Sequence, residues 1–230
     1  MPSRIHLLAA AMILAAMILA ASGARAKDPP PAFPDPAEIP DVEAVFTVER
    51  FGEFRVGFFR DEVPNHVAAF LTLAGSGWYD GMSFHRVIPG YLIQTGDPAS
   101  RDMNLENDGP GGADFTLPAE PTERTHLRGT VAMAWRGDDP ASAGSQFFIV
   151  LDDVPALDGK ATPIGEVTAG MDTVDRISQV STHRNRNPLD RVIIQSVTLT
   201  SPGGEAGADT ATSPGAATAA DTAGTDPEGD

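Results

Sequence analysis

Residues 84–98 read FHRVIPGYLIQTGDP, and this stretch decides the fold. Pro89 fixes its own φ and Gly90 tolerates positive φ, so the pair predicts a tight turn between two short strands. Side chains alternate between the two faces of a strand. Arg86 and Gln94 each share a face with apolar neighbours on this pattern. The stretch therefore places a guanidinium and a carboxamide among apolar side chains. Such a site is suited to binding an amide and not to hydrolysing it.

The same stretch resembles the signature FHRxIPGFxxQxGD of the cyclophilins, a family of peptidyl-prolyl isomerases. A second block, residues 129–149, contains GTVAMA and GSQFFI and is similar to the family pattern GxxSMA…GSQFFI. A third block, residues 157–167, reads LDGKATPIGEV, where the family has LDGKxxxFGxV. The three blocks follow one another in the family's order within residues 44–200. Together they make the resemblance specific, whereas one block alone would be only suggestive.

The rest of the domain is predicted to be mainly β-structure. Apolar residues recur at helical spacing in 65–74 and 171–178, which predicts two helices. Short segments with alternating or β-branched residues predict strands at 42–49, 53–59, 84–88, 91–96, 130–134, 147–151, 164–167 and 192–199. Many short strands with two helices suggest a closed antiparallel barrel. The resemblance implies a closed eight-stranded antiparallel β-barrel capped by two α-helices.

The chain of 230 residues is strongly acidic, with 16 Lys and Arg against 32 Asp and Glu and a formal net charge of −16. Such a charge argues against binding to nucleic acid or to anionic lipid. The sequence contains no cysteine, which excludes disulfides and thiol nucleophiles.

Four segments divide the chain by composition. Residues 1–26 are interpreted as a signal peptide, because Arg4 precedes an uncharged apolar run and Ala24-Arg25-Ala26 supplies a small-x-small cleavage pattern. An uncleaved membrane anchor is the alternative, although the run is short for a membrane span. A proline-rich leader follows at 27–41, and the isomerase-like domain covers 42–200. The tail at 201–230 consists largely of Ala, Gly, Thr, Pro and Asp, with six acidic residues and no basic ones, which predicts disorder.

Isomerisation of an X–Pro bond sets modest chemical demands. Rotation about the amide meets a barrier of about 18–20 kcal/mol, because the C–N bond is partly double. An enzyme needs an apolar pocket for the ring, anchors for the peptide and a donor aimed at the lone pair that develops on the proline nitrogen. Arg86 is the candidate donor, since its guanidinium is always charged and rigid. Gln94 can orient Arg86 and donate to the substrate carbonyl. We expect neither a metal nor a cofactor.

The resemblance extends this site to residues outside the first block. It implies a proline pocket lined by Tyr91, Leu92, Phe148 and Leu157, and a peptide held by Gln146 and the backbone of Ala134 and Trp135. Two positions depart from the family, which frequently has Trp at position 156 and a pocket His at position 161. Both are alanine here.

We interpret the protein as an exported prolyl isomerase, periplasmic or secreted after cleavage near Ala26, that assists protein folding. Its expected partners are proline-containing, unfolded or partly folded polypeptides, with no nucleic acid and no stable membrane association after cleavage. We expect a monomer. The alternative is a cyclophilin-fold binding module or holdase chaperone with little turnover, for which Arg86 would be unnecessary. His85 and His126 have no nucleophile to activate and are interpreted as structural.

Overall fold

The computed structural model describes residue 35 and residues 38–204. The predicted signal peptide (1–26), most of the proline-rich leader and all but the first four residues of the tail lie outside this range, so those assignments stay predictions. Within the described part, no helix is both long and apolar enough to cross a membrane.

Eight strands form one sheet in the described residues, and every pairing between neighbours is antiparallel. The order across the sheet is β3-β4-β6-β5-β7-β2-β1-β8. The strands are β1 Glu43–Val48, β2 Gly52–Phe58, β3 Arg86–Ile88, β4 Leu92–Thr95, β5 Thr130–Met133, β6 Phe147–Val150, β7 Thr162–Ala169 and β8 Ile194–Thr200. All eight predicted strands are confirmed, and their ends differ by at most two residues from the predicted ones.

The sheet curls strongly, but it does not close through a continuous ladder between β3 and β8. Its two ends meet at an isolated bridge between Ser83 and Ile193, beside a 2.9 Å hydrogen bond from the Phe84 N–H to the Val192 carbonyl. Further along β3, the Val87 N–H donates instead to the Arg186 carbonyl at 2.9 Å. The loop before β8 therefore occupies the edge of β3. The structure is an open, curled eight-stranded sheet, where the sequence had predicted a closed barrel.

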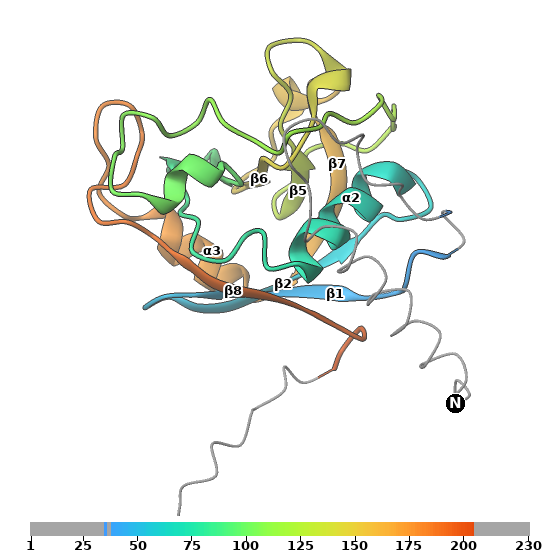
Figure 1. Ribbon diagram of the computed structural model, residues 1–230, viewed down its shortest axis with the longest axis horizontal. Helices are drawn as coiled ribbons and strands as arrows, with labels where there is room; N and C mark the ends of the chain where they lie inside the picture. The colour runs from blue at the N-terminus through green and yellow to red at the C-terminus, as the bar shows by residue number, and fades with distance from the viewer. Residues whose placement is uncertain (1–34, 36–37, 205–230) are drawn as a thin grey trace, which may run out of the picture.

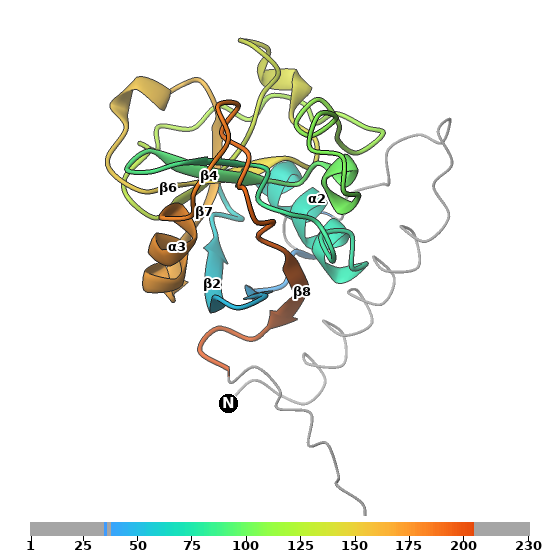
Figure 2. The same cartoon turned by 90° about the vertical axis from the view of Figure 1, so that its left-hand side faces the viewer.

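Two α-helices lie on opposite sides of the curled sheet (Figures 1 and 2): α2, Pro64–Gly75, and α3, Met171–Ser178. Both were predicted within one residue. The 3-10 helices η2 Pro98–Arg101, η3 Pro140–Ser142 and η4 Pro155–Leu157, each beginning with a proline, were not predicted. Proline suits the first helical position because its missing N–H would have no intrahelical partner there.

The main core lies inside the curl and is built around aromatic rings. The Phe147 ring meets Phe70 and Tyr79 edge-on, each with centroids 5.4 Å apart, and Phe46 stacks on Phe54 at 4.7 Å. All five side chains are almost completely buried. Aromatic pairs in these geometries stabilise by about 0.5–1.5 kcal/mol beyond the burial of their area.

The N-terminus of α2 is capped by a residue from a distant loop. The N-cap residue, Val63, offers no side-chain hydrogen bond. Instead the Glu120 carboxylate accepts the backbone N–H of Asn65 at 3.0 Å and that of His66 at 2.9 Å. It also contacts Nδ2 of Asn65 at 2.7 Å and Nδ1 of His66 at 2.6 Å. One carboxylate thus caps the helix and fastens the long loop before β5 to it.

We expect Glu120→Gln to lower the free energy of unfolding at neutral pH by about 0.5–2 kcal/mol, the usual value of a helix cap. Burial acts to raise the pKa of Glu120, but the hydrogen bonds from His66 and Asn65 outweigh it, and the pKa lies below its ordinary value. A lowered carboxyl pKa contributes stability that is complete above the unfolded-state pKa, about 4.3, and is lost as pH falls through the folded value.

The test is urea denaturation of both proteins from pH 7 to pH 3. Their midpoints should converge on acidification, and the exposed Glu123→Gln on the same loop should match the wild type throughout. A midpoint difference that stays constant over this range would contradict the role of the charge.

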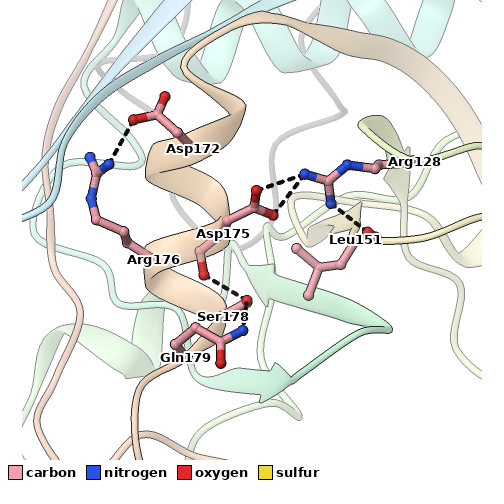
Figure 3. A network of polar contacts seen from close by, with 7 residues as sticks. All are labelled: Arg128, Leu151, Asp172, Asp175, Arg176, Ser178 and Gln179. Carbon is pink, nitrogen blue, oxygen red and sulfur yellow. Dashed lines mark hydrogen bonds and ion pairs between the residues drawn. The ribbon is translucent and has the colours of Figure 1, made fainter.

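Arg128 links α3 to the end of β6 (Figure 3). Its Nη2 contacts both carboxylate oxygens of Asp175, at 2.9 and 2.7 Å, while Nη1 donates to the Leu151 carbonyl at 2.6 Å. One turn away, Arg176 pairs with Asp172 at 2.6 Å. Exposed ion pairs typically contribute about 0.2–1 kcal/mol. This network therefore sets the orientation of α3 more than it sets the stability of the domain.

Candidate functional site

Strand register brings four residues from four strands into one row. Arg86 on β3 lies opposite Gln94 on β4, Gln94 lies opposite Phe148 on β6, and Phe148 lies opposite Ala132 on β5. Residues paired in register share a face of the sheet. The residues next to them in sequence point the other way, into the main core: Val87, Ile93, Phe147, Val131 and Met133. The row is thus on the outer face, with its charged end at β3 and its apolar end at β5.

The apolar end of the row is part of a second cluster, separate from the main core. Its buried members are Leu92, Ala132, Phe148, Val150, Val154 and Ala161, and three partly buried residues pack on them: Tyr91, Ala134 and Leu157. The four side chains predicted to line the proline pocket therefore lie in one cluster. Ala132 and Val150 also belong to the cluster, although neither was predicted as a pocket residue; strand alternation and pairing place both on the same face as Phe148.

The polar end is a directed series of hydrogen bonds. Nη1 of Arg86 donates to Oε1 of Gln94 at 3.0 Å, and Nε2 of Gln94 donates to Oε1 of Gln146 at 2.8 Å. Nε2 of Gln146 in turn donates to the carbonyls of Gly109 and Gly111, at 2.7 and 2.6 Å. The predicted orienting contact between Gln94 and Arg86 is present. One N–H of Gln94 is engaged by Gln146, which leaves its second N–H for a substrate carbonyl.

A cavity of about 260 Å³ opens beside this series, between Gln146 and the segment that follows β5. Ala134 and Trp135 both line it. The indole N–H of Trp135 donates to Oγ1 of Thr162 at 3.0 Å, and its ring packs against the main core. With that side chain occupied inside, the backbone of Trp135 is the part suited to contact a peptide. This placement agrees with the role implied by the resemblance, which stays a prediction.

The guanidinium of Arg86 is exposed and keeps most of its donors available. Among the ion pairs of the described residues, none involves Arg86. Burial lowers the pKa of the neighbouring His85 ring, against the opposing influence of Asp97 and Asp108. His85 is therefore neutral at pH 7 and adds no second positive charge behind the arginine.

His126 packs against the apolar cluster through Phe148. Its ring stacks on Phe148 with centroids 6.0 Å apart, and its Nδ1 lies 3.0 Å from Oδ1 of Asp158. The hydrogen bond from His126 lowers the pKa of the Asp158 carboxyl. No hydroxyl is involved, so the pair is not arranged as a nucleophile and base. The interpretation of His126 as a structural residue agrees with these contacts.

A donor fixed beside an apolar pocket can bind a peptide and stabilise a twisted amide, and it offers no nucleophile. Comparison with known proteins points to the same chemistry. Residues 44–199 match the family model "Cyclophilin type peptidyl-prolyl cis-trans isomerase/CLD".

Relatives with this name come from bacteria and from a eukaryotic parasite. A "Probable peptidyl-prolyl cis-trans isomerase" of Brucella abortus is 45% identical over 141 residues, which cover 58% of this chain and 71% of the relative. A "Peptidyl-prolyl cis-trans isomerase" of Synechococcus elongatus is 40% identical over 124 residues, 54% of this chain and 79% of the relative. The crystal structure of a Cryptosporidium parvum cyclophilin-type isomerase superposes with a TM-score of 0.63 at 28% identity, covering 69% of this chain and 97% of that one. The chain belongs to the cyclophilin-type peptidyl-prolyl cis-trans isomerase family.

Proposed function

We propose that this isomerase acts on X–Pro bonds of unfolded or partly folded polypeptides after export, in the periplasm or outside the cell. The observation that carries the catalytic part is the row from Arg86 through Gln94 to Phe148, which sets one charged donor beside an apolar pocket. A Cryptosporidium parvum relative was crystallised in the presence of the dipeptide Ala-Pro, which supports proline-containing peptides as ligands.

In the proposed mechanism the proline ring enters the cluster around Phe148 and Leu92. As the amide twists, resonance is lost and a lone pair develops on the proline nitrogen. A free N–H of Arg86 donates to this lone pair, while Gln94 keeps the guanidinium in place through the 3.0 Å hydrogen bond. The donor is positioned before the reaction, so it stabilises the twisted state without further reorganisation.

An isomerase assay on a short X–Pro peptide tests turnover against simple binding. We expect exchange between the cis and trans forms, followed by NMR, to rise in proportion to enzyme concentration. A holdase would bind the peptide and broaden its resonances, yet leave the exchange rate at the uncatalysed value of about one event per 10–100 s. That second outcome would overturn the proposed activity.

The export part rests on Arg4, the apolar run after it and Ala24-Arg25-Ala26. We expect the protein purified from its native host to begin at Lys27, which intact-mass spectrometry measures directly. A chain that keeps Met1 and sediments with membranes would assign the segment to the alternative, an uncleaved anchor.

We propose that the protein is a monomer. We also propose that in solution the curled sheet closes into the helix-capped barrel implied by the family. Light scattering after gel filtration tests the first point, and a mass near twice that of one chain would contradict it.

A further inference from the structure

Asp97, the second residue after β4, is a completely buried carboxylate that accepts three backbone N–H groups. Oδ1 accepts from Ala99 at 2.9 Å, which caps η2. Oδ2 accepts from Gly109 at 2.5 Å and from Gly111 at 2.9 Å. Hydrogen bonds to an ionised acceptor are roughly twice as strong as those between neutral groups. One buried charge therefore fixes a loop that lies 12 to 14 residues further along the chain.

The same two glycines hold Gln146 from the other side. Their N–H groups point to Asp97, and their carbonyls accept both N–H groups of the Gln146 carboxamide. A carboxamide has donors on one arm and an acceptor on the other. With its nitrogen held by the loop, Gln146 must turn its oxygen to Gln94, and Gln94 must then turn its own oxygen to Arg86.

The contact between loop and carboxylate leaves no room for a side chain. A Cβ atom added to Gly111 would lie 2.2 Å from Oδ1 of Asp97. Glycine is therefore required at this position for close approach, and the carboxylate and the loop are in direct contact.

From this geometry we infer that Asp97 is a positioning residue for the isomerisation. It fixes residues 109–111, which orient Gln146, then Gln94 and finally the guanidinium of Arg86. Asp97 contacts no substrate, and its effect reaches the reacting amide only through this series. The inference rests on the proposed role of Arg86 as the donor.

The test compares Asp97→Asn with Asp139→Asn. Asp139 is a matched control, because it caps η3 through Ala141 at 3.0 Å as Asp97 caps η2, but holds no second loop. We expect Asp97→Asn to lower kcat/KM roughly 10- to 100-fold, mainly through kcat, since small misplacements of catalytic groups have effects of this size. Asp139→Asn should stay within about twofold of the wild type, because surface substitutions have small effects.

A double-mutant cycle with Gln146→Ala distinguishes positioning from general damage. If Asp97 acts through Gln146, the double variant should be no slower than Gln146→Ala alone. Losses that multiply, or an Asp97→Asn protein with wild-type activity, would overturn the inference. Should Asp97→Asn fail to fold, Gly111→Ala keeps the aspartate but forces the loop and the carboxylate apart, because its Cβ would lie 2.2 Å from Oδ1, and it should show the same loss.

The side-chain amide resonances of Gln94 and Gln146 report the series without any turnover. Both should shift in Asp97→Asn or Gly111→Ala and stay unchanged in Asp139→Asn, and unchanged resonances in the first two variants would overturn the positioning role. If instead the wild type shows no catalysed exchange while these shifts occur, the proposed function fails and the positioning of Arg86 stands.

Discussion

Replacing Arg86 with alanine is expected to lower kcat/KM about 100- to 1,000-fold, the usual effect of removing one preorganised donor. The side chain is exposed, and its one intramolecular partner in the row is Gln94. Its loss therefore leaves the core untouched, and the CD spectrum and melting temperature should remain close to those of the wild type. The measurement is NMR exchange or a coupled assay on an X–Pro peptide.

Two further variants sharpen this result. Arg86→Lys should recover only part of the activity, because an ammonium group cannot reproduce the planar fork that serves both Gln94 and the substrate. Arg60→Ala, on the connection between β2 and α2, removes an arginine outside the site and should retain full activity. An Arg86→Ala protein with near-wild-type kcat/KM would show that the donor is another group.

The adjacent residues Phe147 and Phe148 are expected to separate stability from function. Phe147 is completely buried in the main core, where it contacts the rings of Phe46, Phe70 and Tyr79. Phe147→Ala should lower the free energy of unfolding by about 3–5 kcal/mol, since it leaves a cavity among rings that cannot collapse around it. Urea denaturation measures this loss directly.

Phe148 points to the opposite face, into the second cluster. Phe148→Ala should cost less stability, because its cluster is much smaller than the main core and its outer members, Tyr91, Ala134 and Leu157, are only partly buried. Losing its contact with the proline ring, about 1.5–3 kcal/mol of apolar burial, should lower kcat/KM roughly 10- to 100-fold. Phe148→Leu, which keeps an apolar surface, should recover part of the activity. Equal losses of stability in the two alanine variants would contradict the assignment of the two faces.

Strand positions could be predicted from the sequence because alternation and turn residues act over a few neighbouring residues. Pro89 and Gly90 specify their turn locally, and the helix of α3 follows from apolar residues at a spacing of three to four. The pocket residues Leu92 and Phe148 could be predicted for a different reason: the sequence blocks that contain them resemble those of a known family. The structure then brought both into one cluster.

The predicted barrel is confirmed in its eight antiparallel strands but not in its closure, because closure depends on which segment occupies one edge of the sheet. The strand pattern does not reveal that the Arg186 carbonyl takes the N–H of Val87 in place of a partner on β8. Backbone hydrogen bonds to a loop require no particular side chain, so no residue type marks them in advance.

The sequence by itself determined the strands, the two helices, and the presence of a guanidinium and a carboxamide beside apolar residues. Only the tertiary structure decided how the polar groups are connected. Gln94 meets Gln146 across 52 positions of sequence, and Glu120 caps a helix that begins more than 50 residues before it. Asp97 holds the loop at Gly109 and Gly111 in the same way. Local pattern predicts an element because its causes lie within it, whereas these contacts exist only once the strands have paired in register and the long loop has packed against them.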